Sequence, residues 1–478
     1  MSPALAKRIV VVGGGLGGLA AAAILGRAGH TVTLLEASSE LGGKSRRIEV
    51  GGQRMDTGPS LVTFPGVWEE LLRRWDGLGD GRESAAEVAG LRLRRLGEVG
   101  RYYYKGEVSS LPVEEGHPWR AAWEKFEAIH GGLGPEVTSL LTADPLDRGT
   151  LPALLKLLRV YGAKLTTRGY LDGLGWLPEG LREVIAIHTL NAGVGPNRTP
   201  ALYASMPAIM ARDGVWVPEG GVYEIPRALE NLARAAGVEV RTGETVTAIL
   251  EGRVLTENDE YRADAVVSGL DAGVLQEKLA PHRNKVRPVK LSCSGVAIYA
   301  ALRENLPEGV ATHGVVLPRD PQALYRSLEA GEEPEETMAF VNHYRPDEVY
   351  PNDAGTLALL LTAPPNGREY GLESPFVERE LRRLGREIGL PRPIEEYLGE
   401  HEILHPRYFE GWGAPGGALY GAVRPFWRSG PFHSPRYNDR RRPWLWRVGA
   451  SVHPGGGIPA VLGGAMISTS RLLRSLEG

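Results

Sequence analysis

Residues 8–36 read RIVVVGGGLGGLAAAAILGRAGHTVTLLE, and this run indicates the fold of the chain. The β-rich residues 9–12 lead into a cluster of glycines, and an Ala-rich helix is predicted to follow up to about Gly29. A second strand is predicted at residues 31–35. Strand, glycines, helix and strand in this order predict one βαβ unit of a dinucleotide-binding fold.

The glycines of this unit stand at GxGxxG spacing, and each has a physical reason. Gly13 allows the tight turn, Gly15 lets a pyrophosphate approach the backbone, and Gly18 lets the helix pack closely on the strand. The amino end of the helix then faces the phosphates. Glu36 ends the second strand, where its carboxylate can accept hydrogen bonds from ribose hydroxyls.

A second glycine motif, LGGK at residues 41–44, follows almost at once. The two motifs together indicate a dinucleotide, with flavin favoured over nicotinamide. Residues 51–64 predict a hairpin or strand that passes beneath the ligand, because Gly58 and Pro59 require an irregular turn.

Two later blocks return to the same kind of structure. The first predicts a helix from near Pro226 to Gly237 and then strands at 238–241, 245–250 and 265–268. The last contains strand-like WRVGAS (446–451), the turn VHPGGGIP and a helix from about Ala460. A discontinuous cofactor domain, interrupted twice by a substrate domain, is the simplest arrangement.

Composition excludes several classes of partner. The 478 residues hold 55 Lys plus Arg and 58 Asp plus Glu, so this near-neutral balance gives no case for nucleic acid. The single cysteine, Cys293, excludes an internal disulfide and fits a reducing compartment, with the cytosol as the default. The uncharged stretches 9–26 and 448–470 contain too many glycines or prolines for a membrane-spanning helix. No metal site is expected.

Three segments resemble the phytoene desaturase family of carotenoid-modifying flavoenzymes, within the amine-oxidase-like flavoproteins. They are residues 11–47 with DTGPSLVTF (56–64), residues 188–271, and VGASVHPGGGIPAVLGGA (448–465), which is the most specific of the three. Residues 75–182 and 302–443 match only loosely. Residues 193–197 read GVGPN where many members read GGNP, so substrate contacts there are not carried over.

The resemblance implies an α/β fold with a discontinuous Rossmann-like FAD-binding domain and an inserted mixed α+β substrate domain that has a helical, membrane-associating part. The first would comprise residues 1–75, 213–290 and 440–478, and the second residues 76–212 and 291–439. The residues expected to bind FAD are Gly13, Gly15, Leu16, Gly17, Gly18, Glu36, Gly42, Gly43, Lys44, Gly58, Pro59, Ser60, Val246, Gly449, Ala450, Gly457, Ile458 and Val461.

The reaction implied is desaturation of an acyclic carotenoid, in which FAD accepts hydride while the protein positions the substrate and excludes water. The substrate would be phytoene-type or a hydroxylated later intermediate. The helix that begins near Ile458 would point its amides at the pyrimidine end of the isoalloxazine ring. No catalytic base is assigned, because His188 and His453 are more often structural in such segments.

Residues 151–168, LPALLKLLRVYGAKLTTR, carry four leucines on one helical face and four cations with no acid among them. This pattern fits a basic amphipathic helix that lies on a membrane, or a helix packed on the core with a solvated basic side; both interpretations stay open. A lipophilic substrate favours the first, with the enzyme peripheral on the inner face of the cell membrane. The oligomeric state is not written in the sequence.

Two other functions remain as alternatives. One is a carotenoid isomerase or another amine-oxidase-like flavin oxidase. The other is a non-enzymatic prenyl-lipid-binding protein on the same scaffold, against which the intact glycine motifs and Glu36 argue.

Overall fold

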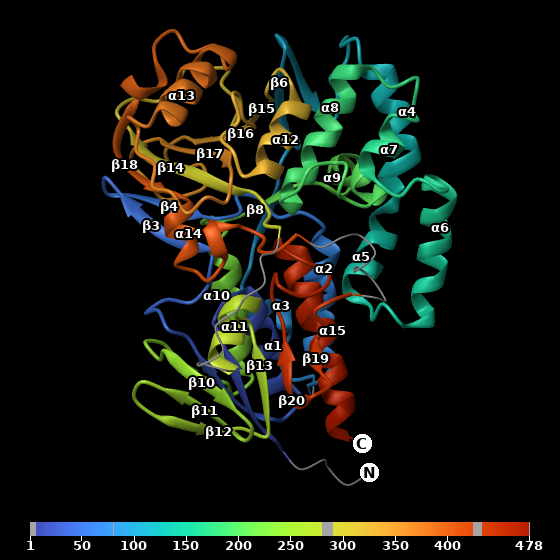
Figure 1. The fold of residues 1–478 in the computed structure, drawn as a ribbon, viewed down its shortest axis with the longest axis vertical. Helices are drawn as coiled ribbons and strands as arrows, with labels where there is room; N and C mark the ends of the chain where they lie inside the picture. Colours follow the sequence, from blue (N-terminus) through green and yellow to red (C-terminus); the bar gives the residue numbers. More distant parts are fainter. Residues whose placement is uncertain (1–5, 80, 280–289, 424–432, 478) are drawn as a thin grey trace.

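Two large sheets form the two halves of the molecule (Figure 1). The computed structural model describes residues 6–79, 81–279, 290–423 and 433–477. The lower half holds a six-stranded sheet of order β19-β20-β13-β1-β2-β9, parallel except for β19. Its strands are β1 (Arg8–Val12), β2 (Thr31–Leu35), β9 (Glu239–Arg241), β13 (Ala265–Ser268), β19 (Asn438–Asp439) and β20 (Arg442–Arg447).

Three helices cover one face of this sheet. The first, α1 (Leu16–Arg27), is almost entirely buried, because its alanines are small and its glycines have no side chain, so neighbours approach closely. It contacts α10 (Glu224–Ala235) and the C-terminal α15 (Ile458–Glu477). The strands predicted at residues 31–35 and 265–268 have those bounds in the structure.

The upper half holds a seven-stranded sheet of order β18-β14-β17-β16-β15-β6-β7. It is antiparallel except where β15 pairs with β6. Its strands are β6 (Gly100–Tyr104), β7 (Glu107–Leu111), β14 (Ser294–Leu302), β15 (His313–Val316), β16 (Ala339–Tyr344), β17 (Thr356–Ala363) and β18 (Leu398–Leu404). The helix α13 (Pro375–Glu387) packs its apolar face on this sheet, and α12 (Pro321–Ala330) lies nearby (Figure 1).

Smaller elements join the halves. The hairpin of β3 (Arg46–Val50) and β4 (Gln53–Thr57) turns at Gly51 and Gly52. Of the hairpin or strand predicted over residues 51–64, the structure has one strand, β4, which Gly58 follows with a φ of +88°. The remaining short elements are β5 (Leu93–Arg95), β8 (Trp216–Pro218), β10 (Val246–Leu250), β11 (Arg253–Thr256), β12 (Glu260–Arg262), α11 (Ala272–Leu279) and α14 (Pro406–Glu410). Strands β5 and β6 follow one another along the chain but belong to different sheets. Strand β20 ends at Arg447, so WRVGAS is a strand only at its start.

A group of helices stands beside both sheets, mostly on the right in Figure 1, with α3 in the middle of the view. Its members are α2 (Pro65–Gly77), α3 (Ala85–Ala89), α4 (Arg120–His130), α5 (Gly134–Thr142), α6 (Leu151–Tyr161), α7 (Thr167–Leu171), α8 (Glu179–Ile187) and α9 (Met206–Asp213). Helix α6 lies at the outer edge and buries Ala153, Leu157 and Tyr161. Its four face leucines are exposed and do not pack on the core, although the helix itself packs there through Leu157 and Tyr161.

The division into two discontinuous domains stays a prediction. The six-stranded sheet takes its strands from residues 8–35, 239–268 and 438–447. Residues 1–5, 80, 280–289, 424–432 and 478, which belong to the predicted domains, lie outside the described residues.

Candidate cofactor-binding site

The loops that follow β1, β2, β13 and β20 meet at the carboxyl edge of the six-stranded sheet. In parallel sheets this edge is where nucleotides bind, because the helix amino ends and loop backbones converge there. The three separated sequence motifs all contribute to this edge.

The first motif forms a tight turn between β1 and α1. Gly13 has a φ of +97°, which glycine adopts without strain, and its N–H donates to the Leu35 carbonyl at 2.8 Å. A Cβ at Gly18 would overlap the carbonyl oxygen of Gly13. Only glycine at this position therefore permits the observed approach of helix and strand.

The second motif lies directly beside the first. The Gly42 N–H donates to the Gly14 carbonyl at 2.9 Å, and Gly15 and Gly42 form an isolated parallel bridge. A Cβ at Gly43 would lie 3.0 Å from the Gly15 Cα. The two glycine segments, predicted separately, thus form one continuous surface of backbone.

Glu36 lies next to the glycine turn and is 8% exposed. Its Oε2 accepts the Gly14 N–H at 2.7 Å, while its Oε1 accepts the Ser38 N–H and hydroxyl, each at 2.9 Å. A carboxylate has about four lone-pair sites, so Glu36 can still accept a hydrogen bond from a ribose hydroxyl besides the three that it accepts here. The side chain therefore has a structural role that the sequence did not predict: it holds the turn.

Lys44 is half-buried where the second motif meets the rest of the site. Its Nζ donates to the Leu419 carbonyl at 2.9 Å. Burial lowers the pKa of the Lys44 ammonium, and the charge of Asp271 opposes that shift. Gly58 adjoins it, since a Cβ there would lie 2.5 Å from the Lys44 carbonyl oxygen. Pro59 and Ser60 follow, half-buried.

The third motif packs on the first helix. A Cβ at Gly17 would lie 2.8 Å from the Gly449 nitrogen and 3.2 Å from the Val461 Cγ1. The half-buried Ala450 follows, and the Val461 N–H donates to the Gly457 carbonyl at 2.9 Å in the first turn of α15. A Cβ at Gly457 would meet nothing within 4 Å, so this loop borders open space.

Val246 lies behind Glu36 instead of beside the glycines. Its buried side chain packs with Leu35 and Val12, and the Glu244 N–H donates to the Glu36 carbonyl at 2.9 Å. This packing leaves the backbone of Val246, and not its side chain, for the ligand contact expected from the resemblance.

The residues at this edge fit a dinucleotide with a diphosphate. The glycine backbone leaves room where side chains would intrude, and the Lys44 ammonium supplies positive charge. The amino end of α1 has no side-chain cap, so its N–H groups are available to an anion.

Sequence reasoning missed three residues at this edge. The Ser451 hydroxyl donates to the Asp271 Oδ2 at 2.9 Å, and the Ala272 N–H donates to the Ser451 Oγ at 3.1 Å. Tyr420 fills the space beside Gly456, where a Cβ would overlap its ring. Asp271 could have been predicted from the sequence, because it follows the carboxyl end of a predicted parallel strand, where ligands bind in such sheets.

The start of α15 is lined by apolar side chains. A cavity of about 10 Å³ separates Ile458, Pro459 and Leu462 from a group of apolar residues on other elements. That group includes Val62, Phe64, Val67, Trp68, Leu91, Leu93 and Ile225. Apolar side chains therefore surround one side of the first turn of α15.

The two histidines considered for catalysis have partners. The His188 ring nitrogen Nε2 lies 2.9 Å from the Tyr102 hydroxyl, and burial lowers the pKa of His188 to about 4. The His453 ring stacks on His433, with centroids 5.3 Å apart. Neither arrangement marks a general base, so the base stays unassigned.

His401 and His405 stand at HxxxH spacing, but they lie in β18 and in the turn after it. Residues four apart in a strand are about 13 Å apart, too far for one metal ion. Within the described ranges, no group of three potential ligand side chains is suited to hold a metal.

The sequence model of one family, described as flavin containing amine oxidoreductase, matches residues 16–303. The chain is 29% identical to the zeta-carotene-forming phytoene desaturase of Myxococcus xanthus, over 98% of this chain and 94% of that protein. It is 26% identical to the 4,4'-diapolycopene oxygenase of Methylomonas sp, and 24% identical to the 4,4'-diapophytoene desaturase of Staphylococcus aureus strain MRSA252. Each of these matches covers 98% of this chain and 99% of the relative. The resemblance to carotenoid desaturases is thereby confirmed.

Solved structures share the mixed α/β fold. Putrescine oxidase bound to putrescine has a TM-score of 0.64 at 15% identity, with 99% of both chains covered. Cyclohexylamine oxidase from Brevibacterium oxydans has a TM-score of 0.61 at 14% identity, with 99% of this chain and 100% of that chain covered. These two likenesses show the fold alone. Because the family match spans well over half of the chain, this protein belongs to the flavin-containing amine oxidoreductases and is an FAD-dependent oxidoreductase.

Proposed function

We propose that this enzyme desaturates an acyclic carotenoid, either phytoene-type or a hydroxylated later intermediate, and transfers hydride to FAD. The observation that carries the proposal is the joining of three distant glycine motifs into one backbone surface, Gly13 to Gly18, Gly42 to Lys44 and Gly449 to Gly457. The names of the relatives, which include phytoene and diapophytoene desaturases, support the substrate class.

In this proposal the glycine segments hold the FAD diphosphate and Glu36 holds the adenosine ribose. Lys44 lies at the diphosphate or ribityl group, and Val246 lies at the adenine through its backbone. Gly58, Pro59 and Ser60 pass beneath the flavin. Ile458, at the start of α15, lies by the pyrimidine end of the ring.

FAD supplies the hydride acceptor. The substrate loses a hydride from one carbon and a proton from its neighbour, so a new C=C bond forms. Beside an existing polyene the positive charge left on carbon is delocalised, and a strong base is unnecessary. The apolar side chains around Ile458 and Leu462 would exclude water from this step.

The proposed substrate is lipophilic and resides in the membrane. We therefore include in the proposal that the enzyme attaches to the cytoplasmic face of the cell membrane. Nine large apolar side chains are exposed in the described part of the chain, and six lie within residues 146–165. These six are Leu146, Leu151, Leu154, Leu155, Leu158 and Leu165, each between 40% and 69% exposed. An apolar cluster of this kind marks a docking surface. Within the described ranges, no helix is long and apolar enough to cross a bilayer.

Expression in cells that accumulate either phytoene or hydroxylated lycopene-type pigment tests the reaction. We expect one pigment to shift its absorption to longer wavelength and to lose two hydrogens in mass for each new double bond. Unchanged pigment mass with altered geometry would identify an isomerase. A gain of oxygen, or no change in either pigment from a yellow, FAD-loaded protein, would contradict the proposal.

Replacing Leu155 and Leu158 by Asn tests the membrane attachment. Each leucine that enters the bilayer contributes roughly 1.5–3 kcal/mol by burial of its side chain. We expect the double variant to stay in the supernatant when phospholipid vesicles are sedimented, whereas the wild type pellets with them. The matched control is Val108→Asn, an exposed apolar residue on β7. Equal pelleting of all three proteins would refute attachment through α6.

A further inference from the structure

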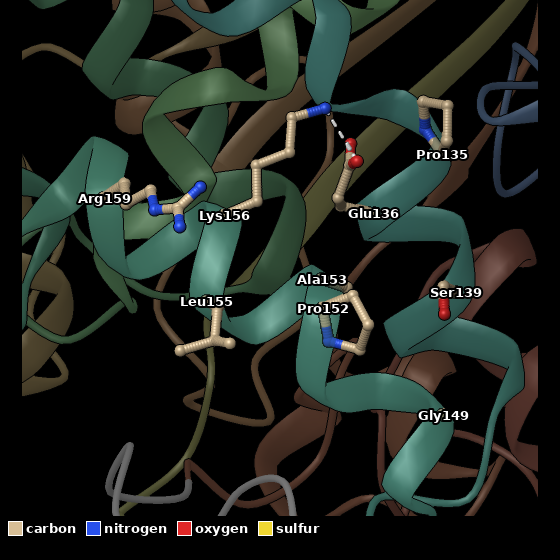
Figure 2. Close-up of a pocket in the computed structure, with 9 residues that line it drawn as sticks. All are labelled: Pro135, Glu136, Ser139, Gly149, Pro152, Ala153, Leu155, Lys156 and Arg159. Atoms are coloured by element: carbon tan, nitrogen blue, oxygen red, sulfur yellow. Dashed lines mark hydrogen bonds and ion pairs between the residues drawn. The ribbon is translucent and has the colours of Figure 1, made fainter.

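A cavity of about 530 Å³ lies between α5 and α6, beside the exposed leucines. Figure 2 shows Glu136 and Ser139 of α5 on one wall and Lys156 and Arg159 of α6 on the other. Leu155 belongs both to the wall of this cavity and to the exposed leucine cluster. The cavity and the apolar surface are therefore continuous.

The cavity carries net positive charge. The Lys156 Nζ lies 2.7 Å from the Glu136 Oε1, so this pair is neutral and holds the lysine across the cavity (Figure 2). The Arg159 side chain forms no hydrogen bond or ion pair with another residue of the described ranges, so one cationic charge is left over. The amino end of α6, whose Pro152 and Ala153 line the cavity, has no side-chain cap and adds a partial positive charge.

The surface around the cavity selects the kind of ligand. Arg148 and Lys164 are exposed near the leucines, and Asp147 is the one exposed acid in residues 146–165. A second copy of this chain would bring the same cations face to face, which is unfavourable. A free anion would leave the leucines in water. A membrane phospholipid with an anionic headgroup matches both features, because its phosphate and its acyl chains are neighbours.

We propose that the cavity between α5 and α6 binds the phosphate headgroup of an anionic membrane phospholipid. Arg159 and Lys156 donate hydrogen bonds to phosphate oxygens, Glu136 positions Lys156, and Leu155 and Leu158 enter the acyl region. The inference rests on the membrane attachment proposed above, and it adds lipid selectivity through a specific cavity.

Vesicle sedimentation with the purified flavoprotein tests the cavity. The vesicles are phosphatidylcholine alone, or an equal mixture of phosphatidylcholine and phosphatidylglycerol. We expect Arg159→Gln to weaken binding to the mixed vesicles about fivefold, the effect of one cation near an anionic surface, and to leave binding to phosphatidylcholine unchanged.

Ser139→Trp distinguishes binding in the cavity from binding to a diffuse basic surface, because the larger side chain obstructs the cavity without changing the charge. We expect a loss similar to that of Arg159→Gln on mixed vesicles. The matched control is Ser475→Trp, on the exposed last turn of α15, which should bind mixed vesicles as the wild type does. An undiminished flavin absorbance shows that each variant is folded.

Three outcomes would overturn the inference. If Ser139→Trp binds mixed vesicles as tightly as Ser475→Trp, attachment stands but the cavity is not the headgroup site. If inorganic phosphate alone gives binding heat that Ser139→Trp abolishes, the ligand is a free phosphate. If the wild type binds neither kind of vesicle, membrane attachment fails together with this inference, while the desaturase assay remains independent.

Discussion

Individual glycines of this protein are required for different reasons. At Gly13 the reason is conformation, since φ is +97°. At Gly17 and Gly18 the reason is space. A side chain at Gly17 would collide with the backbone of the loop after β20, and one at Gly18 would collide with the backbone of the glycine turn. At Gly457 the reason is again conformation, since φ is +87°, and no atom lies within 4 Å of the place of a Cβ, which leaves open space for a ligand.

Gly18→Ala tests the close approach of α1 to the glycine turn. Because the new Cβ would overlap the Gly13 carbonyl oxygen, we expect a loss of about 1–3 kcal/mol in the free energy of unfolding and weaker FAD retention. Urea unfolding and the ratio of flavin to protein absorbance measure both. Gly77→Ala, at the end of α2 where a Cβ meets nothing within 4 Å, should change neither. A Gly18→Ala protein as stable and as yellow as the wild type would contradict the packing argument.

Two buried histidines connect elements of the helical part. The His130 Nδ1 donates to the Phe126 carbonyl at 2.7 Å within α4, and its Nε2 accepts the Tyr170 hydroxyl of α7 at 2.8 Å. His188, directly after α8, pairs with Tyr102 of β6. Both rings act as neutral groups in these arrangements.

These histidines predict loss of stability in acid. Burial lowers the pKa of each to about 4, against about 6.5 in the unfolded chain. The unfolded chain therefore binds more protons between these values, and the free energy of unfolding falls as pH drops from 6.5 toward 4. At about pH 5 each histidine should cost roughly 2 kcal/mol relative to neutral pH.

Urea unfolding at neutral pH and at about pH 5 measures this loss. We expect a His130→Gln, His188→Gln double variant to be less stable at neutral pH but to lose much less stability on acidification. An acid-induced loss as large as that of the wild type would assign the effect to other groups.

At the scale of the whole molecule, the β3–β4 hairpin joins the two halves. The Arg47 Nε lies 2.7 Å from the Asp56 Oδ1, and the Arg47 Nη1 lies 3.0 Å from Glu224 of α10. The Asp56 N–H donates to the Tyr350 hydroxyl at 3.2 Å. The Asp56 side chain is 2% exposed, so the connection is shielded from water.

Asp56→Ala should destabilise the whole protein. It leaves the Arg47 guanidinium without its main partner in a buried site, which we expect to cost about 3 kcal/mol in urea unfolding. Asp264→Ala is the matched control, because its partner Arg8 is 52% exposed and such a pair contributes less than about 1 kcal/mol. Equal losses in the two variants would show that burial of the Asp56 pair is unimportant.

The sequence predicted most local elements of the cofactor half. The strand before Gly13, the helix after it and the strand 265–268 follow from periodicity and glycine placement, which are local properties. Strands β5 and β6 lie close together in the sequence but pair in different sheets, and local patterns do not show which sheet a strand joins. Asp271 and Ser451 were missed because their hydrogen bond joins positions 180 residues apart.

By itself, the sequence determined a dinucleotide fingerprint, its acid at Glu36 and a resemblance to flavin-dependent desaturases, because these depend on residue types at short spacing. Only the tertiary structure decided that Glu36 holds the glycine turn at Gly14 and that the leucines of α6 face outward. A helical pattern shows which residues share a face but not what covers that face. The side of α6 that packs against the core is the one that carries Ala153, Leu157 and Tyr161. The leucines on the other side are therefore exposed.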